Sequence, residues 1–184
     1  ESDVLLISGG VSMGRFDLVE PTLEQLGVEL LFSAVQLKPG KPLVFGRSMT
    51  SNTLVFGLPG NPVSTMVTFE LFVRVAIARL EGALYPVRPL LKASLCTELL
   101  NRGSRRAYLP GWIFADADSQ LFAHPIRSKG SGDIVAFSKA NALLIVPEDR
   151  AGVEKGEDIT VYPLDSFLYK EDTWQLDPNQ NSPT

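Results

Sequence analysis

The sequence contains one cysteine and one histidine, which removes several classes of active site at once. Cys96 alone excludes a disulfide within the chain and a zinc site built from cysteines, and it suits a reducing cytoplasm. His124 alone gives no indication of a catalytic triad. An excess of basic residues is also lacking, since 17 Lys and Arg face 21 Asp and Glu for a net charge of −4. This balance argues against a general nucleic-acid-binding surface, which must be basic.

Long apolar runs are absent as well. None approaches the roughly 18–20 residues that span a bilayer, and no signal peptide precedes the first apolar segment. The composition, 45% hydrophobic and 21% charged, is that of a globular protein. We therefore expect a soluble cytoplasmic protein whose partners include neither nucleic acid nor membrane. A buried parallel strand at 3–8 would need neighbouring strands, so we also expect the chain to be the C-terminal part of a longer one.

What the sequence does contain is three turns rich in glycine and proline, each after an apolar run. They read Ser8-Gly9-Gly10-Val11-Ser12-Met13-Gly14 with Asp17, then Lys38-Pro39-Gly40-Lys41-Pro42, then Leu58-Pro59-Gly60-Asn61-Pro62-Val63-Ser64. If each run is a strand of one α/β sheet, the turns meet outside its carboxyl edge, where such sheets bind ligands. Backbone N–H groups, two lysines and one carboxylate at that edge predict a site for an anion with a metal ion.

The first turn also has a purely structural interpretation. Its glycines permit positive φ and close packing between strand and helix without any ligand. Asp17 has the position of a helix N-cap, because Asp17-Leu18-Val19-Glu20 has the form of a capping box. The functional alternative is that the loop and the following helix hold a phosphate, with the Asp17 carboxylate acting through a divalent cation.

The other two turns leave similar alternatives. Lys38 and Lys41 are either solvated surface lysines or two charges held together around an anion, and the flanking prolines stiffen their display. Asn61 and Pro62 suit the N-cap and first position of a helix over 62–80, which would end at Gly82. That helix is apolar nearly all round, so we expect it to be buried on more than one side, either in a three-layer core or at a subunit interface.

The remaining pattern divides the chain into two parts. A helix from Asp17 to Gly27 and strands near 4–7, 30–37, 43–45 and 53–57 complete an α/β part. An extended linker is predicted at 84–89. Beyond it, short alternating runs predict a β-barrel or sandwich of about five strands, at 90–95, 106–114, 120–125, 142–146 and 158–162. From 165 to 184 the sequence is polar and predicts a disordered tail.

In this order and spacing the turns strongly resemble those of the molybdopterin molybdenumtransferase family, whose module is called the E domain in gephyrin. The resemblance covers about residues 3–164. Similar glycine loops occur in molybdopterin adenylyltransferases, but the lysine turn and the β part favour the molybdenumtransferase. The resemblance implies an α/β fold: the C-terminal part of a three-layer molybdopterin-binding domain at 1–83, followed by a β-barrel domain at 90–164.

The resemblance also implies an activity and a site. The family inserts molybdate into adenylylated molybdopterin and releases AMP, in a Mg²⁺-dependent reaction carried out by a homodimer. The implied molybdate pocket comprises Lys38, Lys41, Pro42, Ser64, Arg105 and Ser131. The implied substrate- and nucleotide-binding residues are Ser8, Gly9, Gly10, Ser12, Gly14, Gly60, Asn61 and Pro62. Asp17 would hold Mg²⁺, and the implied catalytic residues are Asp17, Lys38 and Lys41.

The chain departs from the family pattern in its β part. Pro110 stands where a second arginine is common, and Val135 and Ala136 replace serines after the Gly-Ser loop. The family's N-terminal half also contributes to the site, so we expect this chain to be inactive alone. The competing interpretation is a non-catalytic dimerising scaffold of the same fold, as gephyrin's E domain also is. The intact lysine turn argues against that, because a scaffold does not need paired lysines.

Overall fold

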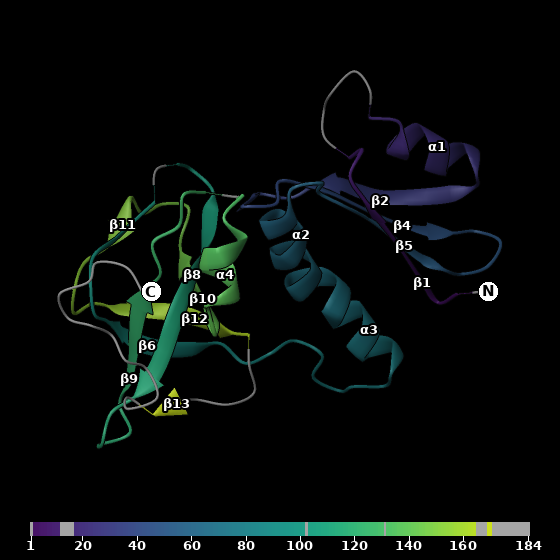
Figure 1. Ribbon diagram of the computed structural model, residues 1–184. Coiled ribbons are helices and arrows are strands. Elements are labelled where there is room, and N and C mark those ends of the chain that lie inside the picture. The colour runs from purple at the N-terminus through teal and green to yellow at the C-terminus, as the bar shows by residue number, and fades with distance from the viewer. Residues whose placement is uncertain (1, 12–16, 102, 131, 165–168, 171–184) are drawn as a thin grey trace. The chain divides into compact units, whose positions relative to one another are not determined.

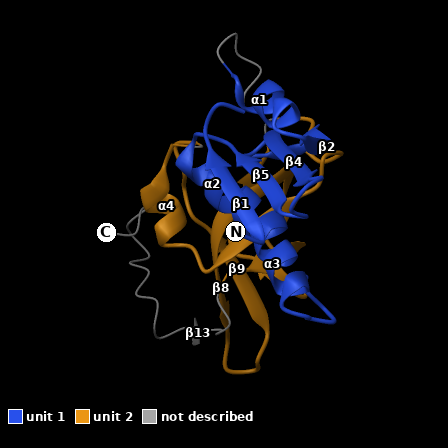
Figure 2. Cartoon of the chain, turned by 90° about the vertical axis from the view of Figure 1, so that its right-hand side faces the viewer, with its two compact units in different colours: residues 1–87 blue, residues 88–184 orange. Residues whose placement is uncertain are grey.

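The computed structural model describes residues 2–11, 17–101, 103–130, 132–164 and 169–170 (Figure 1). The chain forms two compact units, Glu1–Val87 and Arg88–Thr184, which are coloured separately in Figure 2. The division falls inside the stretch 84–89. Across the described ranges, no helix is both long and apolar enough to cross a membrane.

Unit 1 is built on a four-stranded mixed sheet in the order β1-β5-β4-β2. Its strands are β1 (Val4–Ser8), β5 (Leu54–Leu58), β4 (Pro42–Ser48) and β2 (Val28–Ala34), with the short β3 (Leu37–Lys38) following β2. β1 runs parallel to β5, whereas β4 is antiparallel to both β5 and β2. The strand predicted at 30–37 is therefore two pieces, because the chain leaves β2 at Ala34 and the Val35 amide donates to the Lys41 carbonyl.

Helices cover both faces of this sheet, as Figure 1 shows. The helix α1 (Val19–Gln25) lies on one face, where Leu23 packs with Val44 and Val55. On the other face lies the helix that begins at Pro62, where Val73 packs with Leu43 and Phe56. Adjacent strand residues thus serve opposite cores, as the pleat requires. The expected three-layer α/β architecture is confirmed.

The interpretation of Asp17 as the N-cap of α1 is wrong. The N-cap is Leu18, and no side chain makes a cap hydrogen bond. An N-cap at Asp17 would require its carbonyl to accept from the amide of residue 21, but Pro21 has no N–H. With Leu18 as the N-cap, the first hydrogen bond of the helix comes from the Thr22 amide, which donates to the Leu18 carbonyl at 3.1 Å.

The helix predicted over 62–80 is continuous but contains a π turn. It consists of α2 (Pro62–Thr68), the π-helical η1 (Phe69–Val73) and α3 (Arg74–Leu80). Asn61 is the N-cap residue and Pro62 the first helical residue, as predicted, although the Asn61 side chain makes no cap hydrogen bond. In this single chain α3 has no fully buried residue, so for the second half of the helix burial at a subunit interface stays a prediction.

Unit 2 is a closed five-stranded β-barrel in which β10 pairs with β12, then β6, β9 and β8, and β8 pairs back with β10. The strands are β6 (Leu91–Leu95), β8 (Arg106–Ala115), β9 (Leu121–Pro125), β10 (Ala142–Val146) and β12 (Asp158–Pro163). This confirms the barrel expected from the short alternating runs. The barrel is filled by small and branched side chains, among them Ala93, Ile113 and Leu144. Gly111 leaves room for Leu144, whose Cγ would lie 2.4 Å from a Cβ at that glycine.

Smaller elements complete unit 2. β7 (Leu99–Leu100) pairs with β11 (Gly152–Val153), and α4 (Ile134–Ser138) precedes β10. Of the predicted tail at 165–184, only β13 (Tyr169–Lys170) is described, and it pairs in parallel with β8. The other tail residues lie outside the described ranges.

Asn141 extends the pairing of β8 with β10 by one step, just beyond the end of the β8–β10 ladder. Its side chain accepts a hydrogen bond from the Ile113 amide at 2.7 Å and donates one to the Ile113 carbonyl at 2.8 Å. The residue is 5% exposed. One side-chain amide therefore takes the place of a strand residue opposite β8.

We expect Asn141→Ala to lower the free energy of unfolding by about 1–3 kcal/mol, because it leaves both polar backbone groups of Ile113 buried without this partner. Urea titration followed by hydrogen exchange of the β8 and β10 amides measures the change within this unit. Gln120→Ala is the matched control, since Gln120 is exposed and contacts Asp116 through its backbone. Equal stability of the two variants would contradict the prediction.

Candidate anion-binding edge of unit 1

The strand directions bring all three turns to one edge of the sheet. β1 and β5 are parallel, so the first and third turns leave the sheet at the same edge. Because β4 is antiparallel to β5 and to β2, β2 ends and β4 begins at that edge too, and the lysine turn connects them. The convergence expected from the sequence is thus a consequence of the observed pairing, although the sheet is mixed rather than parallel throughout.

The first and third turns touch through glycine backbones. The Gly9 amide donates to the Leu58 carbonyl at 3.0 Å. A Cβ on Gly60 would lie 3.4 Å from the Gly9 Cα, which is tighter than most side-chain contacts. Gly9 and Gly10 have φ values of 90° and 69°, in the region that favours glycine. Positive φ therefore favours glycine at positions 9 and 10, and at Gly10 a Cβ would also meet the Val19 side chain at 2.9 Å.

The lysine turn packs against the helix that follows the third turn. Gly40 is buried with φ 107°, and a Cβ there would lie 2.6 Å from Cγ2 of Thr68 and 3.5 Å from the Ser64 carbonyl oxygen. The Lys38–Pro39 peptide bond is cis. Lys38 is half-buried and Lys41 is exposed. The turn thus holds two lysines beside the first turns of α2.

The hydroxyl groups of α2 are used mainly within the helix. The Thr65 hydroxyl donates to the carbonyls of Asn61 and Pro59, which ties the third turn to the helix. The Thr68 hydroxyl donates to the Ser64 carbonyl at 2.8 Å. The sequence analysis did not single out either threonine. A threonine in the first two turns of a helix can hydrogen-bond a carbonyl of the preceding turn, so its position after a proline-rich turn could have indicated the contact of Thr65 with Pro59. Ser64, predicted in the molybdate pocket, is buried at 6% exposure.

The predicted metal residue stands near this edge. Asp17 is half-buried and precedes α1. Within the described ranges, no group of three or more His, Cys, Asp or Glu side chains could hold a metal ion by itself. Mg²⁺ is commonly bound by one or two carboxylates together with substrate phosphates, so a single aspartate fits such an ion only when a phosphate ligand is bound as well. Ser12 and Gly14 lie outside the described residues.

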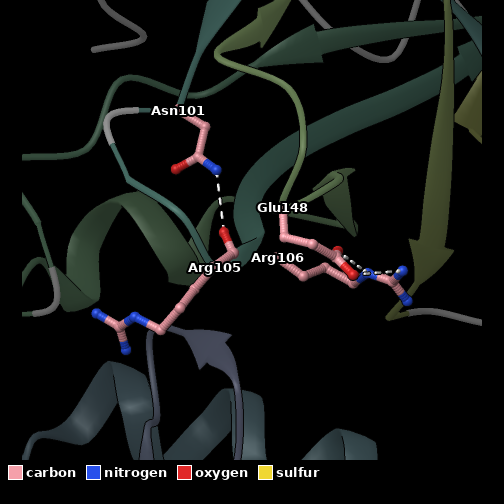
Figure 3. Close-up of polar contacts among 4 residues, drawn as sticks. All are labelled: Asn101, Arg105, Arg106 and Glu148. Atoms are coloured by element: carbon pink, nitrogen blue, oxygen red, sulfur yellow. Dashed lines mark hydrogen bonds and ion pairs between the residues drawn. The ribbon is translucent and has the colours of Figure 1, made fainter.

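The remaining predicted ligands belong to unit 2. Arg105 directly precedes β8, and its carbonyl accepts a hydrogen bond from Nδ2 of Asn101 at 3.1 Å (Figure 3). Arg106 pairs instead with Glu148, with an Nε–Oε2 distance of 3.0 Å. Ser131 lies outside the described residues.

Two ionisable groups in this region are perturbed by their contacts. The pKa of the Glu148 carboxyl lies below its usual value, first through a hydrogen bond from its own backbone amide and then through Arg106. The hydrogen bond with Glu148 raises the pKa of the Arg106 guanidinium. Both shifts favour the charged forms of the two side chains, which are about half exposed. Sequence reasoning missed Asn101 and Glu148, because their partners are fixed only by the fold.

The departures from the family pattern have structural positions too. Pro110 is buried within β8, opposite Leu143 of β10, and its carbonyl accepts from the Ile126 amide at 2.9 Å. Val135 is exposed on α4, whereas Ala136 is buried and donates its amide to Asp133. A proline at 110 is compatible with this ladder because the strand still offers its carbonyl.

Comparison with known proteins matches both units. Residues 1–79 match the family model of a probable molybdopterin binding domain, and residues 92–164 match that of the MoeA C-terminal region (domain IV). The chain belongs to the MoeA family. It is 32% identical over 169 residues to the molybdopterin molybdenumtransferase of Haemophilus influenzae, a match that covers 91% of this chain and 41% of that protein.

Two further relatives agree with this membership. Gephyrin of Dictyostelium discoideum is 37% identical over 179 residues, covering 85% of this chain and 24% of gephyrin. A crystal structure of a molybdopterin biosynthesis MoeA protein from Pyrococcus horikosii superposes with a TM-score of 0.70 at 29% identity, covering 90% of this chain and 38% of that one. The chain spans less than half the length of each of these relatives. The activities of the whole relatives are therefore not assigned to this chain by the comparison alone.

The packing of the lysine turn generates a prediction about stability. We expect Gly40→Ala to lower the free energy of unfolding of unit 1 by about 1–3 kcal/mol, because the new Cβ meets Thr68 and the backbone has positive φ. Gly27→Ala is the matched control: its φ is also positive, at 78°, but a Cβ there meets nothing within 4 Å. Hydrogen exchange of the β4 and α2 amides reports the difference. A cost no larger than that of the control would show that the turn does not pack tightly on α2.

Proposed function

We propose that this chain supplies the anion-binding edge of a molybdopterin molybdenumtransferase, which inserts molybdate into adenylylated molybdopterin with release of AMP. The observation that carries the proposal is the convergence of the glycine loop, the lysine turn and the Pro59–Pro62 turn at one sheet edge beside α2. Family membership supports it, because relatives over most of this chain are named molybdopterin molybdenumtransferases.

Molybdate is a doubly charged tetrahedral oxyanion, and the lysine turn offers what it needs. Lys38 and Lys41 stand three residues apart in a turn fixed by Gly40. Two ammonium groups held near one another repel, and an oxyanion between them replaces that repulsion with charge-assisted hydrogen bonds. We propose that Pro42 and Ser64 line the same pocket and that Arg105 and Ser131 complete it from unit 2.

The glycine loop is proposed to bind the nucleotide part of the substrate. The backbone N–H of Gly10, with Ser8, Ser12 and Gly14, would hold phosphate oxygens beside the Gly60–Pro62 turn. Gly9, whose own amide donates to the Leu58 carbonyl, would let the loop backbone come close to the ligand. Asp17 would hold Mg²⁺ together with those phosphates, and the bound ion would polarise the phosphoanhydride. The role of these residues is to position and to stabilise charge, since the proposed reaction requires no protein nucleophile.

The proposal extends to the assembly and its location. We propose that the protein acts as a homodimer in the cytoplasm, and that turnover requires regions that its longer relatives possess beyond this chain. Binding of molybdate, rather than turnover, is therefore the property to test on the 184-residue chain. Binding also separates the transferase from a scaffold of the same fold, for which an oxyanion site has no use.

We expect molybdate to bind the chain saturably in the presence of AMP and Mg²⁺, and Lys38→Ala and Lys41→Ala each to weaken binding roughly tenfold to a hundredfold, the loss of one charge-assisted hydrogen bond. Isothermal titration calorimetry measures the affinity. Lys155→Ala, an exposed lysine of unit 2, is the control for net charge. Equal binding by all three variants would exclude the lysine turn as the site.

We expect Asp17→Asn to reduce the Mg²⁺-dependent part of AMP binding by about tenfold while leaving AMP binding without Mg²⁺ nearly unchanged, because only the ion-mediated contact needs the carboxylate. Titrations with AMP at high Mg²⁺ and with EDTA give the two affinities. Asp118→Asn, an exposed aspartate of unit 2, serves as the control. If Mg²⁺ enhances AMP binding equally in wild type and Asp17→Asn, then Asp17 does not hold the ion.

A further inference from the structure

We propose that Asn101 is a positioning residue for Arg105, and that the Arg106–Glu148 pair is the second tie that fixes the direction of the Arg105 side chain. The inference rests on the proposed function in one respect, the contact of Arg105 with the oxyanion. Asn101 belongs to none of the three glycine- and proline-rich turns. It is identified by its burial and by the contacts that it makes around the start of β8.

Asn101 joins two segments that are far apart in the sequence. Its side-chain Nδ2 donates to the Arg105 carbonyl at 3.1 Å, and its backbone amide donates to the Ala151 carbonyl at 2.7 Å. Asn101 is 3% exposed and Arg105 is half-buried, so the hydrogen bond between them is partly shielded from water. A buried side-chain donor to a backbone carbonyl holds that peptide more firmly than an exposed one, because water cannot take its place.

The second tie acts on the next residue. Nε of Arg106 donates to Oε2 of Glu148 at 3.0 Å, and Nη2 of Arg106 donates to Oε1 of Glu148 at 3.5 Å. Glu148 belongs to the same loop as Ala151, between β10 and β11. Asn101 and Arg106 are therefore joined to the loop at 148–151 through two residue pairs, Asn101–Ala151 and Arg106–Glu148, both within unit 2. The segment at 101–106 and this loop also line one surface hollow of about 550 Å³, to which Asn101, Ser104, Glu148 and Arg150 contribute.

These ties determine where the two adjacent arginines point. Arg105 lies in the bend that leads into β8, and Arg106 is the first residue of that strand. Arg106 is engaged by Glu148, and the hydrogen bond from Asn101 to the Arg105 carbonyl holds the bend from which the Arg105 side chain leaves. Figure 3 shows the Arg105 guanidinium turned away from the Arg106–Glu148 pair. Asn101 and Glu148 thus select which of two neighbouring arginines is presented to a ligand.

The positioning is tested first without any ligand. Nε–Hε signals of Arg105 and Arg106 are assigned in ¹⁵N NMR spectra of the 184-residue chain by Arg105→Lys and Arg106→Lys. Asn101→Asp keeps the size of the side chain but places an oxygen against the Arg105 carbonyl. We expect it to shift or broaden the Arg105 signal while the Arg106 signal stays at its wild-type position. An unchanged Arg105 signal would overturn the inference.

Molybdate titration tests the link to function, with Asn101→Leu in place of Asn101→Asp because it removes the hydrogen bond to Arg105 without adding a negative charge near the anion. We expect Asn101→Leu to weaken binding about tenfold in the wild-type background and less than twofold in the Arg105→Ala background, because its effect passes through Arg105. A general structural defect would weaken binding equally in both backgrounds, and that result would overturn the positioning role. If the Arg105 signal responds but Arg105→Ala leaves molybdate affinity unchanged, the positioning stands and the proposed role of Arg105 in the oxyanion pocket fails.

Glu148→Gln provides a second variant on the surface, to be used with the same readouts if Asn101→Asp does not fold. Removing a negative charge near an anion site strengthens anion binding through electrostatics alone. Loss of positioning has the opposite effect, so we expect severalfold weaker binding of molybdate and a shifted Arg105 signal. Tighter binding with an unchanged Arg105 signal would overturn the inference.

Discussion

The parallel pairing of β1 with β5 is the constraint on which the candidate site depends. It places the ends of both strands at one edge, where the Gly9 amide donates to the Leu58 carbonyl and Gly60 lies beside Gly9. The antiparallel β4 then returns the lysine turn to that edge. With the opposite direction for any of these strands, the same motifs would lie at opposite ends of the sheet. Topology, rather than any single residue, creates the site.

The sequence was a good guide wherever a motif has a local physical cause. Glycine-rich turns, the Asn61-Pro62 helix start and the alternating barrel strands were predicted, because each follows from backbone sterics or from side-chain period. Asp17 was misjudged because a cap motif competes with Pro21, whose missing N–H delays the helix. The π turn at Phe69–Val73 leaves no local signal, since its residues suit an ordinary helix equally well.

Contacts between distant residues could not be predicted. Asn141 and Asn101 are both asparagines before or after short strands, and their sequence neighbourhoods suggest ordinary loops. Only the fold brings Asn141 against Ile113 and Asn101 against Arg105. The same holds for Arg106, which looks equivalent to Arg105 until Glu148 is placed beside it. Family resemblance supplied the interpretation of Arg105, whereas the contacts that surround it came from the structure.

The closed ring of β-strands in unit 2 has a consequence for how the protein associates. Its barrel strands each have neighbours on both sides, so their backbone groups are not exposed as a template for another strand. The sheet of unit 1 is open, and among its described strands β1 and β2 are the outermost. Leu5 and Leu6 on β1 are each more than 40% exposed. A further strand can therefore be added at the outer strands of unit 1 but not at the barrel strands of unit 2.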